Sequence, residues 1–207
     1  MPNGSGTSAA LGREALLDAF DKIGRAAARA GAKLQIAVYG GSALMLVSNF
    51  RFATEDVDVS ELPRPLPDWL VTAIHEIAEQ NQWRDDWFND GVVFHLSPLA
   101  DRAGDHLEFG SFPRDGTPPG LVVFVPSAKY LLALKLKALR LADPIRGETE
   151  RLDILNLMRV VGISTVEDAI ALLGRYFPMS AASSEKQRFL LNNMNREGGT
   201  DAPRYPR

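Results

Sequence analysis

The segment VYGGSALMLVSNFRFATEDVDV constrains the fold more than any other part of this chain. A short apolar run ends at Gly40-Gly41-Ser42, and a helical pattern and a polar turn then lead to Asp56 and Asp58. This order predicts a strand, a helix that opens at a glycine turn, and a second strand. Residues two apart on a strand point to the same face, so Asp56 and Asp58 are expected to project together beside the turn.

The rest of the sequence alternates strands with helices and then becomes helical, which predicts an α/β fold. Apolar spacing and turn residues give the expected elements. We expect helices at 11–29, 42–47, 69–80, 129–140, 148–161, 165–176 and 184–194, and strands at 34–38, 57–59, 92–96, 107–112 and 121–125. These elements predict a mixed sheet of four to five strands flanked by helices, with a helical C-terminal part.

Composition shifts divide the chain into four parts. Residues 1–10 are rich in Gly and Ser and are predicted to be a flexible N-terminus, followed by an α/β core over 11–126. A helical part packed on that core is expected over 127–195, and the Gly-, Pro- and Arg-rich tail 196–207 is predicted to be disordered. The aromatic and acidic stretch WRDDWFND is expected to be a loop.

Composition also limits the partners and the compartment. The chain has 207 residues with a net charge of −3, which gives no strong field toward DNA or an anionic membrane, although a local basic patch could still bind RNA. The absence of cysteine excludes disulfides, cysteine-ligated zinc and a thiol nucleophile. No apolar run reaches the roughly 18 residues that span a bilayer, and the N-terminus lacks the apolar region of a signal peptide. We therefore predict a cytoplasmic protein with no membrane or DNA partner.

The aspartate pair is a candidate metal site. Paired carboxylates bind Mg²⁺ or Mn²⁺ together with substrate phosphates, and two such ions about 4 Å apart can hold both oxygens of an in-line displacement. The alternative is a solvent-facing strand end, but Val57 and Val59 are expected to face inward and neighbouring carboxylates repel each other. A bound cation would relieve this repulsion, so Asp56 and Asp58 are predicted to bind metal.

The glycine turn is a candidate phosphate site, because glycines allow close approach of backbone N–H groups and a helix N-terminus favours negative charge. Ser42 could add a hydroxyl contact. A tight strand-to-helix turn would explain Gly40-Gly41-Ser42 equally well if it stood alone. Its short distance along the chain from the aspartate pair favours the phosphate interpretation.

The helix YLLALKLKALRLA places Lys135 among leucines and alanines, where a charge needs a negative partner or must reach solvent. Lys135 is a candidate contact for the β- or γ-phosphate, whereas Lys137 lies on a different helical face. Further along, Glu150 and Asp153 share a helix face, either as a solvated pair or as partners of a buried cation. Asp153 directly precedes an apolar run, so it is favoured over Glu150 as that partner.

These motifs, in this order, resemble the DNA polymerase β-like nucleotidyltransferase superfamily. GGSAL followed by Arg51 and the pair Asp56 and Asp58 is similar to its glycine and Asp-x-Asp signature. Within the superfamily, the chain is similar over residues 34–177 to AbiEii-like minimal nucleotidyltransferases of toxin–antitoxin and phage-defence operons, in an uncharacterised branch. Their Lys-x-x-Ala-x-Arg and Arg-Asp-x-x-Asp-Ile-like motifs read KLKALR and ERLDI here, with Glu150 in place of the usual aspartate.

The resemblance implies a nucleotidyltransferase-like fold and Mg²⁺- or Mn²⁺-dependent transfer of a nucleoside monophosphate from an NTP to an acceptor hydroxyl. The acceptor would be tRNA, a protein or a small molecule, and the partner a cognate toxin or antitoxin. Lys135 would neutralise phosphate charge, and Asp153 would orient Lys135 or assist the hydroxyl. The implied nucleotide contacts are Gly40, Gly41, Ser42, Arg51, Lys135 and Arg140, and the implied metal ligands are Asp56 and Asp58.

A third carboxylate on a later strand is frequent in the superfamily, and Glu108 is the best-placed candidate here. If Glu108 points away from the pair, the chain either works with two carboxylates or is a degenerate member. The alternative function is then a nucleotide-binding or partner-binding module, such as the antitoxin of a pair, with WRDDWFND and LPRPLP as contact surfaces.

Overall fold

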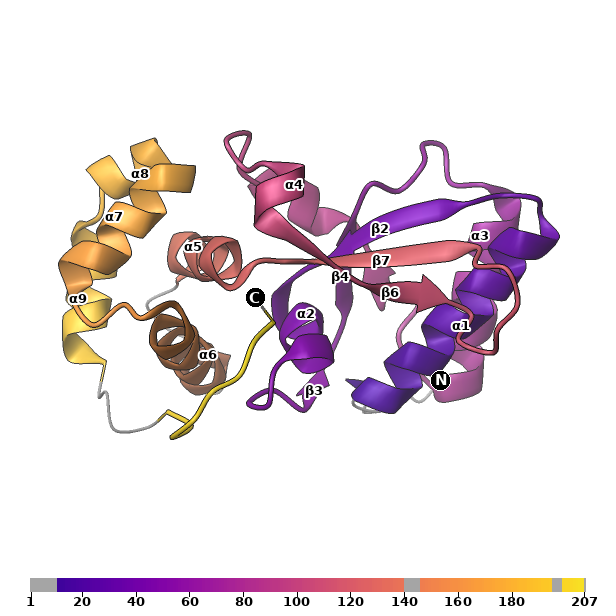
Figure 1. The fold of residues 1–207 in the computed structure, drawn as a ribbon, viewed down its shortest axis with the longest axis horizontal. Coiled ribbons are helices and arrows are strands. Elements are labelled where there is room, and N and C mark those ends of the chain that lie inside the picture. Colours follow the sequence, from indigo (N-terminus) through magenta and orange to yellow (C-terminus); the bar gives the residue numbers. More distant parts are fainter. Residues whose placement is uncertain (1–10, 140–145, 195–198, 207) are drawn as a thin grey trace, which may run out of the picture.

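The computed structural model describes residues 11–139, 146–194 and 199–206, and it is built from a mixed five-stranded sheet, a two-stranded sheet and helices (Figure 1). The α/β class predicted from the sequence is confirmed. In chain order the elements are β1 Leu11–Gly12, α1 Arg13–Arg29, β2 Leu34–Val38, α2 Gly40–Val47, β3 Ala53–Thr54, β4 Val57–Ser60, α3 Asp68–Asn81, β5 Phe88–Asn89, the 3₁₀ helix η1 Gly91–His95, α4 Arg102–Asp105, β6 His106–Phe112, β7 Leu121–Pro126, α5 Ala128–Ala138, α6 Arg146–Val161, α7 Val166–Tyr176, α8 Pro178–Ala182 and α9 Glu185–Asn193.

The main sheet has the strand order β5-β4-β2-β7-β6. Strand β2 runs antiparallel to β4 and parallel to β7, β6 runs antiparallel to β7, and β5 runs parallel to β4. Along β2, every residue except Gln35 is buried, so both faces of this central strand are covered beyond its start. Helices α1 and α3 lie side by side against the sheet (Figure 1).

Two glycines let α1 approach the turn between β6 and β7. A Cβ atom on Gly24 would lie 2.4 Å from the carbonyl oxygen of Phe112, and one on Gly120 would lie 2.1 Å from the carbonyl oxygen of Gly24. Both distances are far below van der Waals contact with backbone atoms that cannot move aside. Any larger residue at either position would push the helix away from the sheet.

Helices α5–α9 lie beyond one end of the sheet (Figure 1), where buried hydrogen bonds tie them to it. The hydroxyl of Tyr176 in α7 donates to Asp105 just before β6 at 2.6 Å. The hydroxyl of Tyr130 in α5 accepts from the backbone N–H of Ser97 at 2.9 Å. None of the helices in the described ranges has the length and apolar character that crossing a bilayer requires.

The strand predicted at 92–96 is wrong, because this segment forms the 3₁₀ helix η1. Phe94 is 84% exposed and Val93 is also exposed, whereas Val92 and Leu96 pack partly against the core, which does not follow the alternation of a strand. The backbone N–H of Gly91 donates to the side chain of Asn89 at 3.0 Å where this helix begins, and the helix packs beside β4 without pairing with it. Part of the predicted WRDDWFND loop, Phe88–Asn89, instead forms strand β5 beside β4.

The tail also differs from the prediction of disorder over its described part, 199–206. The backbone N–H of Thr200 donates to Asn156 of α6 at 2.7 Å, and that of Arg204 donates to Asn49 after α2 at 2.7 Å. Tyr205 is buried, and its hydroxyl donates to the carbonyl oxygen of Pro126. The segment therefore runs from the helical part back to the sheet (Figure 1). Composition gave no sign of this contact, because one buried tyrosine is enough to anchor a polar segment.

Replacing Tyr205 with Ala is expected to lower the free energy of unfolding by about 3 kcal/mol, because the variant loses a buried ring and its hydrogen bond. Tyr205→Phe keeps the ring and should lose only about 1 kcal/mol. Urea unfolding followed by circular dichroism measures both values. Wild-type stability in Tyr205→Ala would show that the tail does not contribute to the folded state.

Candidate active site

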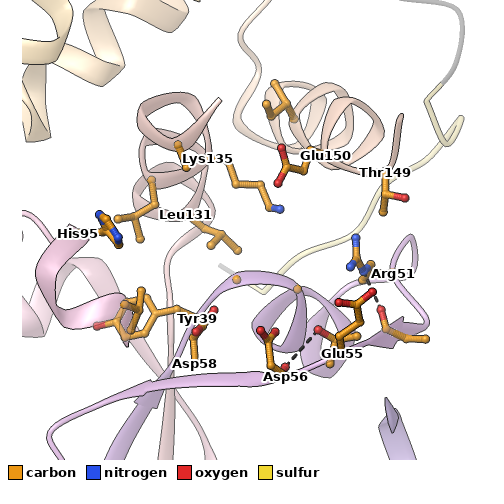
Figure 2. Close-up of a pocket in the computed structure, with 18 of the residues that line it drawn as sticks. Tyr39, Arg51, Glu55, Asp56, Asp58, His95, Leu131, Lys135, Thr149 and Glu150 are labelled. Carbon is orange, nitrogen blue, oxygen red and sulfur yellow. Dashed lines mark hydrogen bonds between the residues drawn. The ribbon is translucent and has the colours of Figure 1, made fainter. Parts of the chain in front are cut away.

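A cleft of about 880 Å³ lies between the β4 side of the sheet and helices α5 and α6 (Figure 2). It contains most of the residues that the sequence motifs predicted for one site, together with several that they did not. Its lining residues are Tyr39, Gly40, Gly41, Phe50, Arg51, Phe52, Ala53, Thr54, Glu55, Asp56, Asp58, Gly91, Val92, His95, Leu131, Leu134, Lys135, Ala138, Thr149, Glu150 and Ile154.

Asp56 and Asp58 both line this cleft, as their spacing predicted. Asp58 lies on β4, and Asp56 directly precedes that strand. Val57 and Val59 are fully buried on the opposite side, so the alternation of the strand sends the two carboxylates to the cleft side. Neighbouring strands fix the backbone at this point, since the N–H of Tyr39 donates to the carbonyl oxygen of Asp58 at 2.9 Å.

The Asp58 carboxyl has an unusual protonation equilibrium. Burial and the neighbouring charge of Asp56 raise the pKa of Asp58 to about 6, although a hydrogen bond from Asn89 and the field of Lys135 oppose this rise. The carboxyl of Asp58 is therefore protonated more readily than that of an ordinary aspartate. A cation bound beside Asp58 would favour its charged form and lower this pKa again.

The donor set matches what Mg²⁺ or Mn²⁺ takes from proteins, namely one or two carboxylates with the remaining positions left to water and substrate phosphates. Beyond the pair, no group of three or more His, Asp or Glu side chains that could hold a metal occurs within the described residues. Glu108, the predicted third ligand, is exposed on β6 and does not line the cleft. Strands β2 and β7 separate it from β4, which corresponds to roughly 14 Å at normal strand spacing.

The glycine turn forms the floor of the cleft beside the aspartates. Gly40 has φ of 66°, a conformation that favours glycine, and a Cβ atom there would lie 3.1 Å from Oδ2 of Asp58. A Cβ atom on Gly41 would lie 3.0 Å from both the guanidinium of Arg51 and the hydroxyl of Thr54. Helix α2 begins here with no side-chain cap, so the turn leaves room and N–H groups for an anion.

Ser42 does not take the predicted place in the cleft. Its side chain is buried and does not line the cleft, and its hydroxyl donates to the carbonyl oxygen of Tyr39 at 2.8 Å. The physical reason is helical geometry, because the third residue of α2 turns inward toward the core. Gly40 and Gly41 are thus the residues of this motif that reach the cleft.

Lys135 reaches the cleft from α5, and Asp153 of α6 holds it there. Oδ2 of Asp153 lies 2.8 Å from Nζ of Lys135 and 3.1 Å from Nη1 of Arg51, and the Asp153 residue is only 1% exposed. The expected pairing of a buried cation with Asp153 rather than Glu150 is therefore present, and Arg51 joins it. Arg140 lies outside the described residues.

The cleft also contains residues that the motifs did not predict. Leu131, Leu134 and Ala138 lie along α5 on the side of Lys135, which helical spacing could have revealed. Phe52 is 76% exposed at the cleft, and no sequence pattern distinguishes it from other loop aromatics. Figure 2 shows His95 beside Leu131 at one end of the cleft.

The pKa of Asp58 predicts how stability depends on pH. Folding raises the pKa of this carboxyl from 3.8 to about 6, so its protonated form stabilises the folded state below pH 3.8. This contribution to the free energy of unfolding is lost as the pH rises through about 6. Asp58→Asn removes this loss, so without metal the variant should be more stable than wild type by about 2–3 kcal/mol at pH 8 and about equal near pH 4. Urea unfolding with EDTA at both pH values measures this, and a difference independent of pH would contradict it.

Comparisons with protein-family models, curated protein sequences and solved structures found no match to this chain. A functional assignment therefore depends on the geometry and chemistry of the cleft itself. The residues that carry it are the aspartate pair, the glycine turn and the Lys135–Asp153–Arg51 ion pairs.

Proposed function

We propose that this protein is a metal-dependent nucleotidyltransferase with a nucleotidyltransferase-like fold, which moves a nucleoside monophosphate from an NTP to an acceptor hydroxyl. One observation carries the proposal. Residues far apart in the sequence line the same cleft, namely the carboxylates of Asp56 and Asp58, the turn Gly40-Gly41 and the ammonium of Lys135. The volume of about 880 Å³ lies in the range of nucleotide-sized ligand sites.

The distribution of charge supports a metal-bound triphosphate as ligand. The aspartate pair lies on the sheet side of the cleft, and Lys135 extends toward it from α5 (Figure 2). A triphosphate between these walls would contact a cation on each side, and the N–H groups at the start of α2 would add further donors. Arg51 lies within reach of the same space, beside Gly41.

Asp56 and Asp58 are the residues that would hold Mg²⁺ or Mn²⁺. When bound, such an ion supplies charge for the phosphates and lowers the pKa of an acceptor hydroxyl. Lys135 stabilises the negative charge that grows on the phosphates in the transition state. Asp153 acts as a positioning residue, because its buried carboxylate fixes the ammonium of Lys135 and the guanidinium of Arg51.

The acceptor is proposed to be tRNA, with protein and small-molecule hydroxyls as the other classes to test. The toxin–antitoxin or phage-defence setting comes from the sequence resemblance. Base preference depends on the shape of the cleft near Phe50, Phe52 and the α5 side chains rather than on the motifs.

The second candidate function is a nucleotide-binding module without catalysis, such as an antitoxin. The position of Glu108 favours it, because the third carboxylate frequent in the superfamily is exposed on a distant strand. Such a module would bind metal and NTP in the same cleft without turnover.

Incubation with each α-³²P-labelled NTP, Mg²⁺ and total cellular RNA and protein tests the transferase directly. We expect label in an RNA or protein band with wild type, and none with the double variant Asp56→Ala/Asp58→Ala, because that variant lacks the metal ligands. Asp85→Ala is the matched control, since Asp85 is an exposed aspartate that does not line the cleft. Nucleotide binding without labelling would favour the binding module instead.

Lys135→Ala should weaken the binding of a non-hydrolysable NTP with Mg²⁺ by roughly 10- to 100-fold, the effect of one charged hydrogen bond. Isothermal titration calorimetry measures this. Lys137→Ala is the matched control, because the ammonium of Lys137 donates to the carbonyl oxygen of His95 at 2.9 Å and does not line the cleft. Equal affinities for the two variants would exclude the phosphate role of Lys135.

A further inference from the structure

Asp153 is poorly placed to take a proton from an acceptor hydroxyl. Its Oδ2 atom already receives ion pairs from Lys135 and Arg51, and the residue is only 1% exposed. Of the two roles expected for Asp153 from the sequence, the geometry supports the orientation of Lys135. Proton transfer then needs another group in the cleft.

Glu150 lies one helical turn before Asp153 on α6 and lines the cleft. Figure 2 shows its carboxylate next to Lys135, on the side of the cleft opposite Asp56 and Asp58. The side chain is half-buried, and no hydrogen bond or ion pair joins it to any residue in the described ranges. Glu148 on the same helix differs, because its carboxylate pairs with Arg151 at 2.5 Å.

The other bases that line the cleft are less suited to this step. Asp56 and Asp58 are the proposed metal ligands, and Glu55 directly adjoins them in the chain. His95 is exposed at one end of the cleft beside Leu131 (Figure 2), away from the ammonium of Lys135. Glu150, on the wall opposite Asp56 and Asp58, is thus the carboxylate that remains as a candidate base.

We propose that Glu150 is the general base that accepts the proton of the acceptor hydroxyl, an inference that rests on the proposed nucleotidyltransferase function. The hydroxyl oxygen forms a bond to the α-phosphorus as its proton passes to the carboxylate of Glu150. The bond from the α-phosphorus to the oxygen bridging to the β-phosphorus breaks, and pyrophosphate leaves with that electron pair. Lys135 and Arg51 stabilise the charge on the phosphates during this step.

The charged groups around Glu150 are consistent with this role. Lys135 of α5 and Arg51 of the loop after α2 bring positive charge to the cleft, and both are fixed by Asp153. Across the cleft, Asp58 on β4 and Asp56 directly before it provide a second pair of carboxylates. An acceptor hydroxyl located between β4 and α6 would therefore meet the metal ligands on one side and Glu150 on the other.

The test compares Glu150→Gln, Glu150→Gly and wild type in full-length protein, with Glu148→Gln as the matched glutamate control. Turnover is measured with α-³²P-labelled NTP and the acceptor that the labelling experiment identifies. Alternatively, water serves as the acceptor, and the release of nucleoside monophosphate is measured. Glu150→Gln should lower kcat by roughly 10²–10⁴-fold while the Kd of a non-hydrolysable NTP stays within about threefold. Added formate should restore part of the activity of Glu150→Gly, because a small carboxylate can occupy the vacated space. Glu148→Gln should match wild type.

The possible outcomes separate this inference from the function on which it rests. Turnover by wild type and Glu150→Gln at similar rates, or a loss of turnover in His95→Gln but not in Glu150→Gln, would overturn the role of Glu150 alone. Parallel loss of NTP binding in Glu150→Gln would also overturn it, since a base acts in the chemical step. Absence of turnover in wild type with every acceptor would overturn the nucleotidyltransferase proposal and this inference with it.

Discussion

The buried carboxylate of Asp153 is the contact on which the arrangement of the cleft depends. Through one oxygen it binds Lys135 of α5 and Arg51 of the loop after α2, so it joins three segments that are distant in the sequence. Removing one partner from a buried ion pair typically costs about 3–5 kcal/mol, because the remaining charge is left without compensation. This contact therefore fixes the helical part relative to the sheet and also holds two cations at the cleft.

The cleft places its aspartate pair and its two cations paired with Asp153 on different walls. Asp56 and Asp58 lie on the sheet side, where burial and then the neighbouring charge of Asp56 raise the pKa of Asp58. Lys135 and Arg51 lie toward the helices, and the turn Gly40-Gly41 leaves open backbone between the walls. This distribution of charge supports the proposed ligand, a metal-bound nucleoside triphosphate, whose metal would face the aspartates and whose phosphates would face Lys135.

Much of the fold could be predicted from local sequence, since most expected helices and strands differ from the observed ones by only a few residues at their ends. Amphipathic spacing and buried runs report burial directly, and burial is what forms these elements. The prediction failed where burial depends on distant partners. The apolar run at 92–96 pairs with no strand and forms a 3₁₀ helix, while Tyr205 in a polar tail is buried by contacts with residues far away in the chain.

The sequence by itself determined the pairing of Asp56 with Asp58, the open turn at Gly40-Gly41 and the α/β class, because strand alternation and glycine geometry are local properties. The tertiary structure alone decided which other candidates reach the cleft. Ser42 turns into the core, Glu108 lies on a distant strand, and Asp153 is committed to two cations while Glu150 lines the cleft. The type and spacing of residues indicate which chemistry a side chain can perform. The packing of helices and strands determines which of these side chains line the same cleft and which are already held by ion pairs with other residues.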